Sequence, residues 1–342
     1  MSAKQTTRPA ARSFDKEMAE LDALKDATLD AAAIAHLRNT LGHRNNFLVA
    51  KAAKLVAEAE LFDLLPDVLA AYDRFFEDAA KSDPQCWAKN ALVKALVTLE
   101  HRQKDAYLRG LRHHQMEGAW GGASDTAGAL RCACTHALVD CPGMSDADLL
   151  TILLEPLVDP DKTVRMEAAR AIGQVGGPSS ALLLRLRALL GSVSADDAEP
   201  EVLGAVYSAL LSVEGERAIA LVAAAMKDGD DLAAQAAFAL AELRTPQALA
   251  ALLTRFQAGA DAWFGSALLS AIALTRLPEA HEFLIAMVAR DAREAPQVIE
   301  ALGWVAPTAE LRARVEKAVA ETGSPRLAQA LRQHMPAARE SE

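Results

Sequence analysis

The chain has 342 residues, of which 51% are hydrophobic and 5% aromatic, and its net charge is −10. So large an apolar fraction excludes wholesale disorder, and the abundance of Ala and Leu favours stacked helices over a sandwich or barrel. The longest apolar run, residues 218–226, is about half as long as a membrane span requires, and no secretory signal is visible. Four cysteines do not make a disulfide scaffold in a chain of this size, so we expect a reduced, cytoplasmic protein.

The beginning of the chain differs from the rest. Residues 1–13 are polar and are expected to form a disordered tail, and residues 14–28 are expected to form an N-terminal capping helix. Beyond them, a small or short residue followed by an aliphatic one recurs every 30 to 42 residues, from Lys54-Leu55 to Ala301-Leu302. Each interval holds a second helical pattern. The sequence therefore predicts a helix–turn–helix unit repeated eight or nine times.

The clearest unit is "DPDKTVRMEAARAIGQVGG", residues 159–177. Its aliphatic side chains recur at helical spacing, an Asp precedes the helix and a Gly-Gly pair follows it. The small-aliphatic pairs, which we call the repeat anchors, share one phase on the second helix of each helix–turn–helix unit. This shared phase predicts that the following residues are buried between repeats: Ala168, Ile172, Ala209, Leu210, Ala239, Leu240, Ala271, Ile272, Ala301 and Leu302.

The far end of the chain continues the pattern. Residues 191–200 form the longest polar loop, but the repeat resumes in phase behind it. A short polar helix over 324–335 is expected to cap the stack, and residues 336–342 are expected to form a tail. We therefore expect a single continuous solenoid over 14–335: an all-α superhelix with a concave face, no β-sheet, and a monomeric state.

The repeat resembles a known type. Residues 159–177 resemble the HEAT-like repeat of the phycobilisome-lyase type, with Asp-Pro, then Val-Arg, then Ala-Ala and a small-aliphatic-Gly ending. "DPQCWAKNALVKALVTL", residues 83–99, resembles it with Lys89 in the Arg position. The resemblance covers roughly residues 29–335 and implies an armadillo-like α-solenoid. Because proteins of many functions share this repeat, the resemblance implies no single activity.

One stretch, residues 112–141, has a different composition. It holds three of the eight His, three of the four Cys and a Gly-Gly pair, and it lies in the only segment with a positive charge balance. Aligned with the clearest unit, Asp125 and Arg131 are the ordinary repeat Asp and Arg, expected to cap a helix and to reach a neighbouring repeat. Residues 115–124 form an expanded loop that is similar to one in a group of bacterial HEAT proteins.

Two interpretations of this loop stay open. In the first, Trp120 fills a gap between repeats and the glycines let the loop fold over it. In the second, the loop stands at the rim of the concave face, where its backbone N–H groups and basic neighbours bind a ligand or partner. The candidate binding residues of the second interpretation are Arg112, His113, His114, Glu117, Trp120, Asp125 and Arg131.

Metal and catalytic signatures are sparse. Cys132 and His136 are four residues apart on one helix face, but a structural zinc site needs four ligands, so we expect no metal and no cofactor. The lysine hydroxylases with HEAT-like repeats carry several His-Glu dipeptides, whereas here only His281-Glu282 occurs. No phosphate-binding loop, nucleophile elbow or zinc-protease motif is present.

Two classes of function follow. The first is a non-catalytic scaffold that grips a protein partner on its concave face, with residues 112–131 as the distinctive site. The second is an enzyme: a helical-repeat DNA glycosylase that uses Trp120, Asp125 and Arg131, or a lyase-like or chaperone-like protein that handles a cofactor on a client. The acidic chain repels phosphate backbones, which disfavours nucleic acid. We therefore expect a protein partner and no catalysis.

Overall fold

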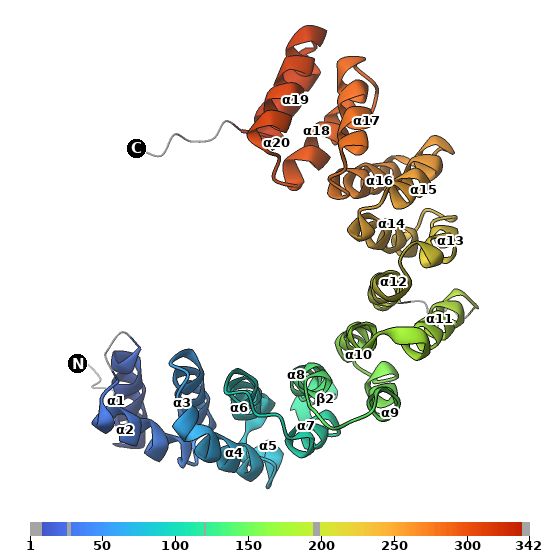
Figure 1. The fold of residues 1–342 in the computed structure, drawn as a ribbon. Coiled ribbons are helices and arrows are strands. Elements are labelled where there is room, and N and C mark those ends of the chain that lie inside the picture. Colours follow the sequence, from blue (N-terminus) through green and yellow to red (C-terminus); the bar gives the residue numbers. More distant parts are fainter. Residues whose placement is uncertain (1–8, 26–28, 120, 194–198, 337–342) are drawn as a thin grey trace, which may run out of the picture. The chain divides into compact units, whose positions relative to one another are not determined.

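The chain folds into helices that pack on their neighbours in sequence (Figure 1). The prediction of an all-α helical-repeat fold is confirmed. In the computed structural model the chain divides into two compact units, residues 1–171 and 172–342. None of the described helices is long and apolar enough to cross a membrane. The structure describes residues 9–25, 29–119, 121–193 and 199–336.

The first unit consists of helix pairs and one small β-hairpin. Helices α3, α6 and α8 lie side by side in one row, and α4 and α7 lie in a second row (Figure 1). Its elements are α1 (Pro9–Leu24), α2 (Ala31–Leu41), α3 (Asn46–Glu58), η1 (Phe62–Leu64), α4 (Leu65–Arg74), α5 (Ala79–Ser82), η2 (Pro84–Cys86), α6 (Trp87–Thr98), α7 (Lys104–Leu111), β1 (Met116–Ala119), β2 (Gly122–Asp125), α8 (Gly128–Val139) and α9 (Asp146–Leu157).

In the second unit every described element is a helix, and α10 (Lys162–Val175) contains residues of both units. Helices α12, α14, α16, α18 and α20 pack in that order as one row. The elements are α11 (Gly177–Val193), α12 (Pro200–Glu214), η4 (Gly215–Ala218), α13 (Ile219–Ala224), α14 (Asp231–Leu243), α15 (Pro246–Gln257), α16 (Ala262–Leu274), α17 (Pro278–Ala289), α18 (Ala295–Trp304), α19 (Ala309–Thr322) and α20 (Pro325–His334).

Short polar side chains set where many of these helices begin. Asp30, Asp230 and Asp261 each accept a hydrogen bond from a backbone N–H in the first turn of α2, α14 and α16. Proline opens α12, α15, α17 and α20, where its missing N–H leaves no donor unsatisfied. The helix boundaries therefore follow from local sequence.

Alanine and leucine on the second helices form the core. The small side chains let neighbouring helices approach closely, as at Gly173, where an added Cβ would lie 3.0 Å from the Cβ of Ala209. The predicted burial of the repeat anchors is confirmed for the whole set, whose side chains are at most 5% exposed: Ala168, Ile172, Ala209, Leu210, Ala239, Leu240, Ala271, Ile272, Ala301 and Leu302.

The ends of the chain and the division between units bear on the predicted boundaries. Helix α1 begins at Pro9, inside the range expected to be a tail, and residues 1–8 lie outside the described residues. Helix α20 falls within residues 324–335, where a short helix was expected, and residues 337–342 lie outside the described residues. That the two units form one continuous solenoid stays a prediction.

Candidate binding site

The distinctive segment contains a β-hairpin between α7 and α8, which corrects the expectation of a fold without strands. β1 pairs antiparallel with β2, with Met116 opposite Asp125. Gly121 and Gly122 have φ angles of +95° and +157° at the turn, conformations that glycine adopts without strain. One further backbone hydrogen bond, from the N–H of Thr126 to the carbonyl of Gln115, closes the base of the ladder. Trp120 lies outside the described residues.

Arg131 is the centre of a buried ion-pair cluster at the base of the hairpin, with a side chain 1% exposed. Its Nε and Nη2 donate to the two carboxylate oxygens of Asp159 at 2.7 and 2.9 Å. Its Nη1 donates to Asp125 Oδ2 at 2.7 Å and to the carbonyl of His113 at 3.0 Å. Because Asp159 opens the following repeat, Arg131 bridges two repeats, as predicted.

Asp125 accepts hydrogen bonds on both carboxylate oxygens. Its Oδ1 accepts from the backbone N–H groups of Gln115 and Ala127, each at 3.0 Å, and its Oδ2 lies 2.9 Å from His114 Nδ1. Burial by itself would raise the pKa of Asp125, but these hydrogen bonds and that from Arg131 outweigh it and hold the pKa well below its usual range. Ala127, and not Asp125, is the N-cap residue of α8.

Gln115 and Glu117 join the hairpin to the preceding repeat. Gln115 is only 3% exposed. Its Nε2 donates to the carbonyl of Asp83 at 2.8 Å and to Glu117 Oε1 at 2.6 Å. The same Glu117 oxygen accepts from the N–H of Gln85 at 2.7 Å and from Thr126 Oγ1 at 2.8 Å. Burial opposes ionisation of Glu117, but these hydrogen bonds prevail and lower its pKa.

A second buried pair, Asp83 with Lys89, shows that the cluster belongs to the repeat. Both side chains are fully buried, and Lys89 Nζ lies 3.0 Å from Asp83 Oδ2. Asp83 also accepts from Asn46 Nδ2 at 3.0 Å, while Lys89 Nζ donates to the carbonyl of Phe75 at 3.1 Å. The spacing from Asp83 to Lys89 equals that from Asp125 to Arg131. Such pairs connect neighbouring helices, so their first role is structural.

The remaining predicted residues have separate partners. Arg112 is half exposed and makes two hydrogen bonds with Glu155 of α9, at 2.8 and 3.0 Å. The ring of His113 packs edge-on against Phe76 with centroids 5.0 Å apart, and burial lowers its pKa.

Taken together, these contacts bring five predicted residues into one hydrogen-bonded cluster: His113, His114, Glu117, Asp125 and Arg131. That the cluster binds a partner stays a prediction.

The pair weighed for metal has other neighbours. The ring of His136 pairs with the carboxylate of Glu167 on α10. Burial, helped by nearby carboxylates, raises the pKa of the Cys132 thiol to about 12, which disfavours the thiolate that binds metals. Over the described residues, no group of three or more His, Cys, Asp or Glu side chains is arranged to hold a metal ion.

A groove of about 770 Å³ lies between α3 and α6 of the first unit. At one end, the rings of Phe47 and Trp87 lie with centroids 5.6 Å apart, yet the two residues are 46% and 51% exposed. The other end is basic. The residues that line the groove are Met18, Phe47, Ala50, Lys51, Lys54, Ala57, Glu58, Trp87, Asn90, Ala91 and Lys94.

The sequence pattern alone did not predict this groove. Phe47 and Trp87 begin their helices, far apart in the chain, and only the packing of α3 against α6 brings them together. A usable signal existed, because both rings fall outside the buried phase of their helices. Aligning the helices of successive pairs would have placed them side by side.

Comparisons with known proteins add no family. No known protein family matches the chain, and no curated protein does. Among solved structures, the crystal structure of an engineered protein is similar over 98% of this chain and 93% of its own length, at 14% identity. Its TM-score is 0.33, so this likeness carries no argument about the present chain.

Proposed function

We propose that this chain is a non-catalytic binding protein with HEAT-like repeats, and that the groove between α3 and α6 holds a segment of a protein partner. The proposal includes a cytoplasmic location and a monomeric state. The observation that carries it is the exposed aromatic pair inside a groove of about 770 Å³. Large apolar side chains gathered in an exposed groove are typical of interaction sites.

The aromatic end supports an apolar anchor on the partner. Trp87 and Phe47 leave about half of their surface in water, although each contributes one face to the groove. A leucine or phenylalanine inserted against them would be removed from water and would contribute about 1.5–3 kcal/mol. Met18 of α1 also lines the groove and offers an adaptable apolar contact.

The basic end supports a partner with carboxylates. Three lysines and a single glutamate line the groove, although the whole chain has a net charge of −10. Lys54 Nζ lies 3.6 Å from Glu58 Oε1, and Lys51 forms an ion pair with Asp22. Lys94 makes no ion pair with any described residue. Lys94 is thus available for a carboxylate of the partner. We therefore propose an acidic amphipathic segment as the ligand.

The hydrogen-bonded cluster at the base of the hairpin (His113, His114, Glu117, Asp125 and Arg131) supports a different role, the rigid connection of three successive repeats. Its carboxylates already accept two or more hydrogen bonds each, and Arg131 is buried. Asp125 and Arg131, the residue types that a glycosylase would need, bind each other. We therefore do not propose that activity.

Calorimetric titration with a defined peptide tests the groove. The probe is an amphipathic helical peptide of about twenty residues, with leucine on one face and glutamate on the other. We expect Trp87→Ala to weaken its binding about tenfold or more, because a central aromatic anchor contributes about 2 kcal/mol or more. Lys94→Glu should also weaken binding, and the loss should be larger at low salt than at high salt, because salt screens charges.

The matched control is Trp304→Ala in the second unit, where the side chain is 80% exposed and the groove is not involved. It should bind the peptide like the unmodified protein. A version of the peptide with lysine in place of glutamate should bind weakly. Equal binding of both peptides, or stronger binding of single-stranded DNA with a steep salt dependence, would overturn the proposal.

A further inference from the structure

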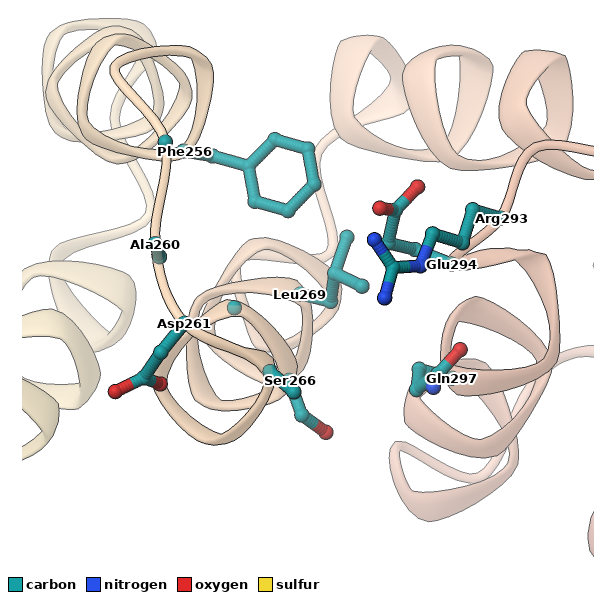
Figure 2. Close-up of a pocket in the computed structure, with 11 residues that line it drawn as sticks. Phe256, Ala260, Asp261, Ser266, Leu269, Arg293, Glu294 and Gln297 are labelled. Carbon is teal, nitrogen blue, oxygen red and sulfur yellow. The ribbon is translucent and has the colours of Figure 1, made fainter.

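A second cavity, of about 330 Å³, lies within the second unit between the loop after α15 and the first turns of α16 and α18. Its volume is at the lower end of the range for small-molecule sites, about 300–1,000 Å³. Phe256 and Leu269 supply its apolar surface, and Leu269 is 1% exposed (Figure 2). The cavity therefore has an apolar floor of the kind that small ligands occupy.

Two opposite charges reach the cavity from consecutive residues. Figure 2 shows Arg293 and Glu294 extending from the segment before α18 toward Leu269 and Phe256. Neither side chain has a hydrogen-bond or ion-pair partner among the described residues, and the same holds for the lining side chains of Ser266 and Gln297. Arg293 and Gln297 are exposed and so meet water in the free protein, and together these polar groups surround a cavity whose floor is apolar, a combination found in binding sites.

The third charged residue of the lining has a structural task. Asp261 accepts a hydrogen bond from the N–H of Phe264 at 2.8 Å and so caps α16. In Figure 2 its carboxylate points away from Arg293 and Glu294. The charges left for a ligand are therefore one guanidinium and one carboxylate, which together favour a molecule that carries both an anion and a cation.

We propose that this cavity binds a free α-amino acid with an apolar side chain. The α-carboxylate pairs with Arg293, whose planar guanidinium suits a carboxylate, and the α-ammonium pairs with Glu294. The apolar side chain packs on Phe256 and Leu269. This site belongs to the second unit and does not rest on the groove proposed above.

Calorimetry with three related probes separates the contributions of the two charges. The probes are L-leucine, L-leucinamide without the carboxylate, and 4-methylpentanoate without the amine. We expect leucine to bind most tightly. Arg293→Gln should make leucine and leucinamide bind equally, and Glu294→Gln should do the same for leucine and 4-methylpentanoate. Each variant should weaken leucine binding roughly tenfold, the usual value of a charged hydrogen bond.

A filling variant tests the cavity itself. Gly265 lines the cavity, and a Cβ added there would meet no atom within 4 Å, so Gly265→Leu places a larger side chain at the cavity wall. It should abolish leucine binding and keep the melting temperature. Arg290→Gln, which changes an exposed arginine outside the lining, is the control and should bind normally. If no probe binds the unmodified protein, or if all three bind equally, the proposal is wrong.

Discussion

Arg131 serves two repeats at once, and its replacement has a clear expected cost. The guanidinium is buried between Asp125 and Asp159, so Arg131→Leu leaves two carboxylates without their shared partner. We expect the free energy of unfolding to fall by about 3–5 kcal/mol, because removal of one partner strands buried charge. Urea denaturation measures this loss. Arg112→Leu, which breaks an exposed pair with Glu155, should cost less than about 1 kcal/mol.

The carboxylate of Asp125 makes stability depend on pH. Its pKa in the folded protein lies well below that of an ordinary Asp, about 3.9, since hydrogen bonds favour the ionised form. The contribution of Asp125 to the free energy of unfolding is therefore fully present above its pKa in the unfolded chain. It is lost as the pH falls through its pKa in the folded protein. Asp125→Asn should destabilise the protein at pH 7, and the difference from the unmodified protein should shrink below a pH of about 4. A difference that stays constant over this range would contradict the assignment.

Some of these contacts could be predicted from the sequence, and others could not. The equal spacing from Asp83 to Lys89 and from Asp125 to Arg131 identified both pairs as repeat elements, and the bridge from Arg131 to a neighbouring repeat followed from that alignment. The partners of Glu117 did not follow. Gln85 and Thr126 reach it from two different repeats, and such contacts depend on packing that no local pattern encodes.

At the scale of elements, helical periodicity was sufficient to place the core and insufficient to find the hairpin. The Ala-aliphatic anchors repeat in phase with the second helices, so their burial could be predicted. The strands β1 and β2 contain Gly, Ala, Met and Ser, which have little preference for strands. Hydrogen bonds from the base of the hairpin hold them instead. The aromatic groove was hidden for a related reason, because it forms only where α3 packs on α6.

Leu240 tests the phase of the second helices. Its side chain is fully buried in α14, so Leu240→Ala removes apolar contacts and leaves a cavity. We expect a loss of about 2–5 kcal/mol in the free energy of unfolding. Leu186→Ala is the matched control, because Leu186 on α11 is 56% exposed and its truncation should cost less than about 1 kcal/mol. Similar costs for the two variants would show that the assigned phase is wrong.

At the scale of the whole molecule, the two units carry different candidate sites. The first unit has the groove with its aromatic and basic ends, and the second has the smaller cavity with paired opposite charges. A helical repeat allows this because each repeat depends mainly on its neighbours, so a local surface can change without altering the rest of the stack. Chain-wide properties such as the net charge of −10 therefore say little about either site.

We propose that the partner segment lies in the groove between α3 and α6 and not on the hairpin. Its most direct test is photo-cross-linking of the acidic amphipathic peptide to a reactive side chain placed at Ala91, which lines the groove, or at Ala123, which is exposed on β2. We expect the peptide to cross-link at position 91, with competition by unlabelled peptide, and not at position 123. Cross-linking at position 123 alone would contradict this placement and would indicate a binding site within residues 112–131.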